Sequence, residues 1–425
     1  MNESGDCIAC NPEGGAVPKG ETWSVRWTGW ALMALGVSLP LSTSGTSILL
    51  GVILLLWIVG GDYTEKLRVM RRHPLAVAAL VLFGLYVVGL IYGKPSGRVV
   101  FDVSHFLLLA VFITLFRDEG MRRFALKGFL AAAILLLVLS YSAWFSLLPK
   151  IDFLHVAPGH ALVIQDRITY SFFMALAAYI FIVHAFFSSS VSERLIYALL
   201  AAPAIFNVFL IDSKTAHVVL PLLLGYFLIS QWRWKGAAAF FIGLAIIATM
   251  TYHIPASAPH QRIAEAIQEF RQWQPDQGDD TSTAHRLEFY RYSMKIVRDY
   301  PFFGVGVGNL KDAFESRVKN HGMATDNPHN EYLMVTVQLG LIGLAALLYL
   351  FYTQWRLASL LPTRRETVLA RGMVLAFMVA CLFNSFLTDY DEGVFFIWIS
   401  ALLFSGWAPL KNKRGVDVSF HSQVK

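Results

Sequence analysis

Long uninterrupted apolar stretches dominate the pattern of hydrophobic and polar residues along this chain. A stretch of about 20 apolar residues is what a helix needs to cross a bilayer, and such stretches recur here with short polar connections between them. Membrane barrels alternate apolar and polar residues instead. The pattern therefore predicts an all-α polytopic membrane protein with about twelve transmembrane helices. These helices are expected to start near Trp27, Thr46, Pro74, Phe101, Phe124, Ile168, Leu195, Ala216, Gly236, His329, Arg371 and Gly393.

One long polar segment, residues 252–327, interrupts the series of apolar stretches. Two sets of apolar residues in it recur at helical spacing: Ile263, Ile267 and Phe270, then Leu287, Tyr290, Met294 and Val297. Residues 274–280 between them are typical of a turn. The glycine-rich stretch Pro301–Asn309 should break regular structure, with glycines at positive φ or at close backbone approaches. The chain thus divides into a tail (1–22), the first nine membrane helices (23–251), a loop with two helices (252–327), the last three membrane helices (328–408) and a second tail (409–425).

Composition and charge agree with this division. The chain is 56% hydrophobic and 15% charged, and its mean hydropathy is +0.53, which is more apolar than a soluble domain. A net charge of +6 would suggest nucleic acid for a soluble protein. Here the basic residues instead mark alternate connections, such as Arg71–Arg72, Arg122–Arg123 and Arg364–Arg365, so no nucleic-acid partner is expected. The positive-inside rule places these connections and both termini in the cytoplasm, and the 252–327 loop on the other side.

Three short motifs could indicate a metal or a cofactor. Cys7 and Cys10 form a single C-x-x-C in the tail, which is a weak zinc or redox signal. The G-x-G-x-G run follows no predicted strand, so a dinucleotide site is not expected. Asp389-Tyr390-Asp391 resembles the D-x-D that holds a metal and a nucleotide sugar, but sugar nucleotides are cytoplasmic and this turn faces outward. Neither a metal nor a cofactor is expected, and a role for Asp389 in orienting a histidine or arginine is preferred.

The candidate for chemistry is His329, which immediately precedes the apolar segment Met334–Tyr352. Asn327 is a good N-cap and Pro328 suits the first helical position, so His329 is expected in the first turn of a long helix. The positive end of a helix attracts anions and disfavours an imidazolium, which leaves a neutral ring able to accept a proton. His329 is therefore a candidate general base beside an anion site. The alternative is a polar cap at the lipid–water boundary without chemistry.

Three cations could bind an anion near this histidine. Lys214 lies in a very short outer turn between two apolar stretches, where it could contact a phosphate or pair with Asp212. Arg286 and Arg291 lie in the second predicted loop helix. Because they are five residues apart they point to different faces, so only one is expected to reach a shared site. Arginine binds phosphate oxygens through two parallel hydrogen bonds and therefore suits a diphosphate.

Two motifs around His329 resemble the signature of the O-antigen ligases of the WaaL type. The first is Pro-His-Asn-Glu-Tyr-Leu, which starts at Pro328, and the second is Gln-Leu-Gly-Leu-Ile-Gly-Leu, which ends at Leu344. The preceding Arg286 and the 301–309 glycine run strengthen the resemblance. It implies a GT-C-like enzyme of the bacterial inner membrane whose active site faces the periplasm. Such enzymes move a polysaccharide from undecaprenyl diphosphate to lipid A–core without ATP or a metal. The family often has arginine where this chain has Lys214, which keeps the charge but loses the planar fork.

The resemblance also implies roles for individual residues. His329 would be the essential histidine that deprotonates the acceptor hydroxyl. Residues expected to bind the diphosphate are Arg286, Lys214 and Arg291, and residues expected to support the site are Asn330, Tyr332 and Asp389. The implied partners are the undecaprenyl-diphosphate-linked glycan, the lipid A–core acceptor and membrane lipids.

Two other functions fit the same sequence. Related O-antigen polymerases and protein O-oligosaccharyltransferases carry out the same chemistry on another acceptor. A multi-span transporter is a rival of a different class. Transporters usually carry charges near mid-membrane and paired repeats, whereas the charges here lie at the outer ends of predicted spans, which favours the enzyme.

Overall fold

The computed structural model describes residues 23–94, 96–116, 118–253, 267–274, 282–318 and 325–407. Within these ranges the regular elements are helices, apart from one isolated bridge between Ile151 and Val156. The prediction of an all-helical protein is thus confirmed for the described part. Both tails, with Cys7 and Cys10, lie outside the described residues, as do Ile263 and most of the predicted turn at 274–280.

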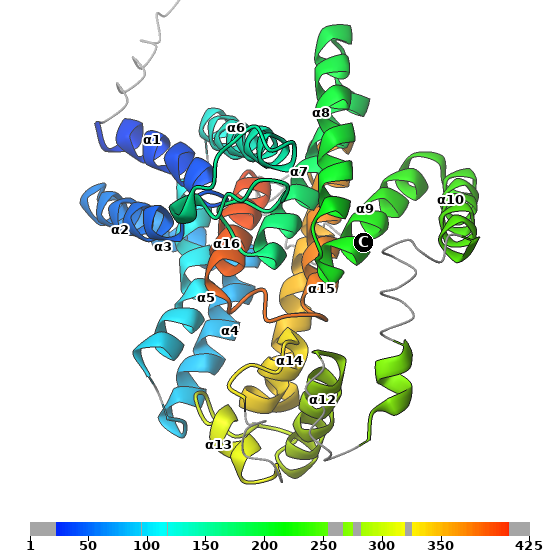
Figure 1. The fold of residues 1–425 in the computed structure, drawn as a ribbon. Helices are drawn as coiled ribbons and strands as arrows, with labels where there is room; N and C mark the ends of the chain where they lie inside the picture. The colour runs from blue at the N-terminus through cyan, green and yellow to red at the C-terminus, as the bar shows by residue number, and fades with distance from the viewer. Residues whose placement is uncertain are drawn as a thin grey trace, which may run out of the picture.

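Each predicted membrane span coincides with a helix (Figure 1). These helices are α1 (Trp23–Ser38), α2 (Thr43–Val59), α4 (Pro74–Ile91), α5 (Gly97–Leu115), α6 (Glu119–Trp144), α7 (Arg167–Phe187), α8 (Val191–Leu210), α9 (Lys214–Trp232), α10 (Trp234–His253), α14 (Glu331–Ala358), α15 (Arg364–Ala380) and α16 (Tyr390–Phe404). Among the described residues, six helices are long and apolar enough to cross a membrane, or up to seven if α2 and α3 (Tyr63–Arg72), bent by 113°, form one span. The chain is a multi-pass membrane protein, and the total of twelve spans stays a prediction.

Helix α16 lies at the centre of the bundle, where it packs against α5, α6, α14 and α15 (Figure 1). Every residue from Glu392 to Leu402 is buried. Trp398 is fully buried, and its ring contacts those of Phe116, directly after α5, and Phe129 in α6, with centroids 6.3 and 6.0 Å away. A helix that is apolar on all sides is stable only inside other protein or lipid. The start of α16 is consequently held in a fixed position by the surrounding helices.

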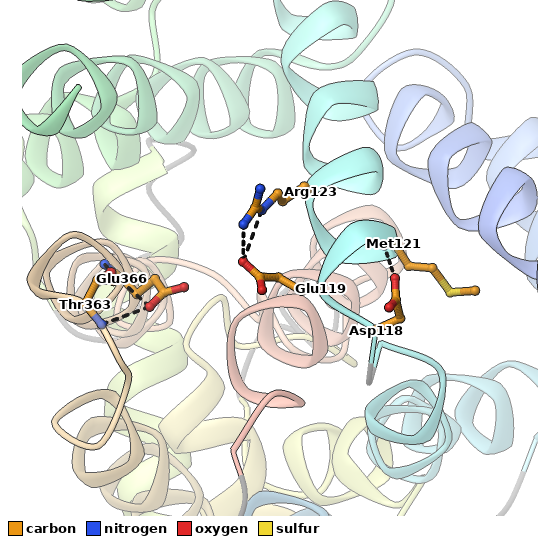
Figure 2. A network of polar contacts seen from close by, with 6 residues as sticks. All are labelled: Asp118, Glu119, Met121, Arg123, Thr363 and Glu366. Atoms are coloured by element: carbon orange, nitrogen blue, oxygen red, sulfur yellow. Dashed lines mark hydrogen bonds and ion pairs between the residues drawn. The ribbon is translucent and has the colours of Figure 1, made fainter. Parts of the chain in front are cut away.

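Arg122, Arg123 and Arg365 lie close together at one end of the bundle, where α6 and α15 begin, and Figure 2 shows polar contacts at this end. Asp118 caps α6 by accepting from Met121 N, and Glu119 pairs with Arg123. Thr363 and Glu366 form a capping box at the start of α15. These contacts satisfy backbone N–H groups that the first turn leaves without partners. The gathering of basic residues agrees with the alternation of charge in the sequence, and its cytoplasmic placement stays a prediction.

The opposite end of the bundle carries the loop helices. Residues Leu287, Tyr290, Met294 and Val297 all lie in α12 (Ser282–Asp299), so the second helical pattern of the loop is confirmed. Residues 267–272 are also helical, which agrees with the described part of the first pattern. The short helix α13 (Leu310–Glu315) was not predicted. Buried residues of α12, α13 and α14 form a small apolar cluster that packs the loop helices onto the start of α14.

The glycine-rich stretch joins α14 through main-chain hydrogen bonds. Gly340 breaks α14, with φ 70° and ψ −166°, and a Cβ there would lie 2.1 Å from Phe302 O. Leu341 N donates to Pro301 O at 2.8 Å, and Gly306 N donates to Gln338 O at 3.0 Å. The loop backbone therefore satisfies groups that the break in α14 exposes, as an interrupted membrane helix requires.

The break also explains the length of α14. Its 28 residues would span about 42 Å as a straight helix, more than the bilayer's hydrocarbon core of about 30 Å. The 18 residues after Gly340 are about the number that a helix needs to cross the core, so the segment Glu331–Leu339 is expected near one boundary of the bilayer. Glycines at 304, 306 and 308 have φ between 67° and 89°, which confirms the prediction of positive φ in this stretch.

Candidate functional site

His329 lies just outside α14 and not in its first turn. The helix begins at Glu331, and its N-cap is Asn330, whose Oδ1 accepts from Leu333 N at 3.0 Å. The prediction that Asn327 caps this helix was therefore wrong. Asn327 Oδ1 accepts instead from His329 N at 2.8 Å and turns the chain before the helix, with His329 at φ 51°. Because the dipole effect is confined to the terminal turn, the chemistry of the ring has to come from its own hydrogen bonds.

A chain of hydrogen bonds links His329 to a carboxylate. His329 Nδ1 lies 2.8 Å from Asn384 Oδ1, and Asn384 Nδ2 donates to Asp389 Oδ2 at 2.9 Å. A carboxylate only accepts, so Asp389 fixes which end of the Asn384 amide faces the ring. The amide oxygen needs a donor, and His329 Nδ1 must therefore carry the proton. In the neutral ring Nε2 is then the acceptor, and among the described residues it has no hydrogen-bond partner.

A second amide connects the same carboxylate to the turn before α14. Asn327 Nδ2 lies 3.4 Å from Asp389 Oδ1, and Ser385 Oγ donates to Asn327 Oδ1 at 2.8 Å. Asn327 thus holds the His329 backbone, the 381–389 turn and Asp389 at once. The structure places Asp389 two hydrogen bonds from the histidine, in the position expected of an orienting residue.

The first turn of α14 is bonded to the 381–389 turn between α15 and α16. Glu331 is fully buried, and its Oε2 accepts from Leu387 N at 3.0 Å. Its backbone N donates to Cys381 O at 2.9 Å. Asn330 Nδ2 donates to Leu382 O at 3.2 Å, and Tyr332 Oη donates to Met378 O at 2.7 Å. Two of the three predicted supporting residues, Asn330 and Tyr332, therefore hold the α14 start against the end of α15 and the turn that follows it.

Helix α12 borders the other side of the histidine. The Phe289 ring lies 6.2 Å from the His329 ring, and Tyr290 Oη donates to Leu382 O at 2.9 Å. Arg286 precedes Phe289 by three residues and so lies on the same face of α12. It is half-buried, and among the described residues it has no hydrogen-bond or ion-pair partner. Arg286 is therefore the loop arginine on the side of His329.

Arg291 and Lys214 lie elsewhere in the structure. Arg291 pairs with Glu288 at 3.3 Å, and its guanidinium lies 5.4 Å from the centre of the Tyr292 ring. Lys214 is the first residue of α9 and is exposed. It has no hydrogen bond or ion pair with a described residue. Asp389 is thus linked to His329 through Asn384. Asn330 and Tyr332 hold the adjacent start of α14, and Arg286 lies on the α12 face that carries Phe289. The structure shows no contact that brings Lys214 or Arg291 to this site.

The two carboxylates of Asp389-Tyr390-Asp391 contact different groups. Asp389 binds the two asparagines, whereas Asp391 Oδ2 accepts from Thr43 at 3.0 Å. Within the described ranges, no group of three or more histidine, cysteine, aspartate or glutamate side chains could hold a metal ion. The D-x-D arrangement therefore serves as two separate anchors of the α16 start.

The sequence reasoning missed Asn384 and Ser385. The available signal was the cluster of polar residues between Asn384 and Glu392, which stands out between two apolar stretches. Buried polar groups of this kind are hydrogen-bonded and specify a particular arrangement. Here the arrangement is the support of the histidine.

The fold and this site define a class: a multi-pass membrane protein with a histidine-centred polar site at one end of its helix bundle. Residues 196–348 match the family model described as O-Antigen ligase (Wzy_C), which supports the assignment of the chain to the O-antigen ligase family. The matched region includes α9, α12, His329 and the break in α14. No curated protein matches the chain.

Proposed function

We propose that this protein is an O-antigen ligase. It transfers polysaccharide from undecaprenyl diphosphate to a sugar hydroxyl of lipid A–core at the periplasmic face of the bacterial inner membrane, with both termini in the cytoplasm. The observation that carries the proposal is the His329–Asn384–Asp389 chain, which leaves Nε2 of a neutral imidazole without a partner among the described residues. The family match over residues 196–348 supports the same class of reaction.

His329 acts as the general base. Nε2 takes the proton of the acceptor hydroxyl. At the same time the hydroxyl oxygen attacks the anomeric carbon of the donor from the side opposite the diphosphate. The carbon–oxygen bond to the diphosphate breaks with its electron pair, so the product has inverted configuration. The Asn384–Asp389 pair stabilises the imidazolium that forms. A positioned base of this kind contributes about 10²- to 10⁴-fold in rate.

The departing diphosphate needs positive charge. Arg286 supplies it from the α12 face that carries Phe289, and its half-buried guanidinium has the geometry for two parallel hydrogen bonds to phosphate oxygens. Lys214 supplies a second charge from the start of α9, where backbone N–H groups also favour an anion. The lipid diphosphate already contains a good leaving group, so the reaction requires neither ATP nor a metal.

The acceptor separates this proposal from its nearest rivals. A polymerase would use a growing glycan, and a protein O-oligosaccharyltransferase would use a protein hydroxyl. In a deletion strain, a missing ligase leaves lipid-linked polymer, whereas a missing polymerase leaves single repeat units. A transporter would move labelled substrate across vesicles without any glycan product.

The direct test is transfer by the purified full chain in lipid nanodiscs, with lipid-linked glycan and lipid A–core. His329→Ala is expected to lower kcat by about 10²- to 10⁴-fold. His155→Ala is a matched control, because His155 also has a positive φ (50°) and a ring Nδ1 bonded to an oxygen, that of Ile164. Full activity of His329→Ala would refute the assignment of the base.

A further inference from the structure

A groove of about 650 Å³ lies between α7, α8 and α9. Helix α8 stands at the edge of the bundle and packs against α7 and α9 (Figure 1). The wall of the groove is apolar apart from Arg194, and it includes Ala198 and Ala202 on the exposed side of α8. The volume falls within the range of small-molecule sites, about 300–1,000 Å³. The groove is therefore large enough for an apolar ligand that approaches from the lipid side.

This groove is separate from the histidine network. Thr169 Oγ1 lies 2.5 Å from Glu392 Oε1, so the start of α7 lies beside the start of α16, which Asp389 precedes. The part of α7 that lines the groove begins at Ile182, which is about 20 Å farther along the helix. The groove therefore belongs to the end of α7 that is remote from His329.

The length of the groove matches one leaflet of a bilayer. Its lining residues on α8 recur at helical spacing from Arg194 to Ile205, a distance of about 16 Å along a helix. The hydrocarbon core is about 30 Å thick, so this distance is about half of it. Helix α8 is itself one of the helices that are long and apolar enough to cross a membrane. An acyl chain of a phospholipid has the length that this groove accepts.

The Arg194 end of the groove has the residues of a membrane boundary. Trp232 is exposed, and the centre of its ring lies 5.7 Å from that of Phe186 and 6.4 Å from that of Phe227. Both phenylalanines line the groove. Tryptophan is enriched where lipid meets water. This end of the groove is therefore expected at the level of the lipid headgroups.

Two arginines lie at this boundary. Arg194 donates to Ser188 O at 3.1 Å, which holds its guanidinium near the end of α7 and leaves other N–H groups for a ligand. Arg233 follows Trp232, and it has no hydrogen bond or ion pair with a described residue. Its φ of 51° is a conformation that favours glycine. Glu193 also lies here, and its Oε2 accepts from Ser188 Oγ at 2.6 Å. Two cations against one carboxylate favour an anion at this end of the groove.

We propose that the groove binds a phospholipid with an anionic headgroup from the cytoplasmic leaflet. One acyl chain fills the apolar groove, and the headgroup phosphate contacts Arg194, with Arg233 adding a second positive charge. Basic pockets between membrane helices on the cytoplasmic side bind anionic headgroups in this way. The guanidinium can donate two parallel hydrogen bonds to phosphate oxygens. The inference goes beyond the proposed function and does not depend on it, since no step of glycan transfer involves this groove.

The charge requirement is tested by native mass spectrometry of the full chain in detergent, titrated with phosphatidylglycerol or phosphatidylethanolamine. We expect one phosphatidylglycerol to bind more tightly than phosphatidylethanolamine, and salt to weaken this preference. Arg194→Gln and Arg233→Gln should each lower the affinity for phosphatidylglycerol about fivefold, the effect of one charge near a membrane surface. Arg233→Gln removes no hydrogen bond between described residues, so it remains informative if Arg194→Gln fails to fold. Arg71→Gln is the control, because Arg71 is exposed on the same predicted side and does not line the groove.

The position of the lipid is tested by filling the groove. Ala202→Phe should abolish the bound phosphatidylglycerol, whereas Leu199→Phe, on the exposed part of α8 outside the groove, should not. Equal affinity for the two lipids in the parent would overturn the headgroup selectivity. Unchanged binding in a folded Ala202→Phe variant would overturn the groove as the site. A parental dimer that Ala202→Phe separates would show that a second copy of the chain occupies the groove, and this too would overturn the proposal.

Discussion

Asn384 provides the sharpest test of how the histidine is prepared for catalysis. Its amide makes two hydrogen bonds, 2.8 Å to His329 Nδ1 and 2.9 Å to Asp389. Asn384→Ala removes both. A hydrogen bond between neutral groups contributes about 1 kcal/mol, and one to a charged group about 1.5–3 kcal/mol. The bond to Nδ1 becomes charge-assisted as the imidazolium forms, so the variant should lose about 1.5–3 kcal/mol of transition-state stabilisation.

This loss corresponds to a fall in kcat of about 10- to 100-fold, because each 1.36 kcal/mol is a factor of ten. The assay is steady-state glycan transfer by the purified chain over a range of pH, with Tm measured beside it. Unchanged KM values for donor and acceptor would show that Asn384 positions the base and contacts neither substrate.

Asn384→Asp gives a readout that a purely structural role would not produce. A carboxylate next to Nδ1 favours the protonated ring, and the base has to be neutral to act. The acid limb of the pH–kcat profile should therefore move to higher pH, whereas in Asn384→Ala it should not move upward. A parental kcat in Asn384→Ala, or an unmoved acid limb in a folded Asn384→Asp, would refute this account of the network.

Three further predictions concern the loop arginines, the break in α14 and a helix cap. Arg286→Lys should lower kcat more than Arg291→Lys in the same transfer assay, because Arg286 lies on the α12 face toward the histidine and Arg291 pairs with Glu288; an equal effect would contradict this placement. Gly340→Ala should prevent folding or lower Tm sharply. The backbone at this position has a glycine-only conformation, which costs about 1–3 kcal/mol for another residue, and the new Cβ would lie 2.1 Å from Phe302 O. The control Gly51→Ala, with open space around it, should fold with an unchanged or higher Tm. Thr363→Ala should destabilise by about 1 kcal/mol through loss of the α15 capping box, measured as a lower Tm with unchanged kcat.

The arrangement of apolar stretches sufficed to place the helices. Because a membrane helix satisfies its own backbone, its position depends on local composition. The same holds for α12, whose apolar residues at helical spacing identify it without any tertiary information. The alternation of basic connections likewise follows from the sequence, since it reflects insertion of each segment into the membrane.

The start of α14 could not be predicted because Asn327 and Asn330 are equally good caps. The choice between them is made by distant contacts, such as the bond from Glu331 N to Cys381 O. The link from His329 to Asn384 is of the same kind, since it joins residues 55 positions apart. The preferences of neighbouring residues contain no information on such distant pairings. The polarity of residues 384–392 did indicate that these side chains need hydrogen-bond partners.

The break at Gly340 was hidden for a related reason. Residues 338–344 have the composition of a continuous helix, and the positive φ at Gly340 is stabilised by a segment about 35 residues earlier in the chain. The glycines of that segment were correctly predicted at positive φ. Their partner on α14 could not be identified from the sequence, because the bonds involve only main-chain atoms.

A loop fastened through its main chain leaves its side chains available for change. Phe302 and Phe303 are 64% and 66% exposed, although their neighbours are bonded into the gap of α14. Replacing these two rings alters the surface that the loop presents but removes none of its anchoring bonds. Substitutions in this loop can therefore change the surface of the protein while the positions of His329 and of the helices stay the same.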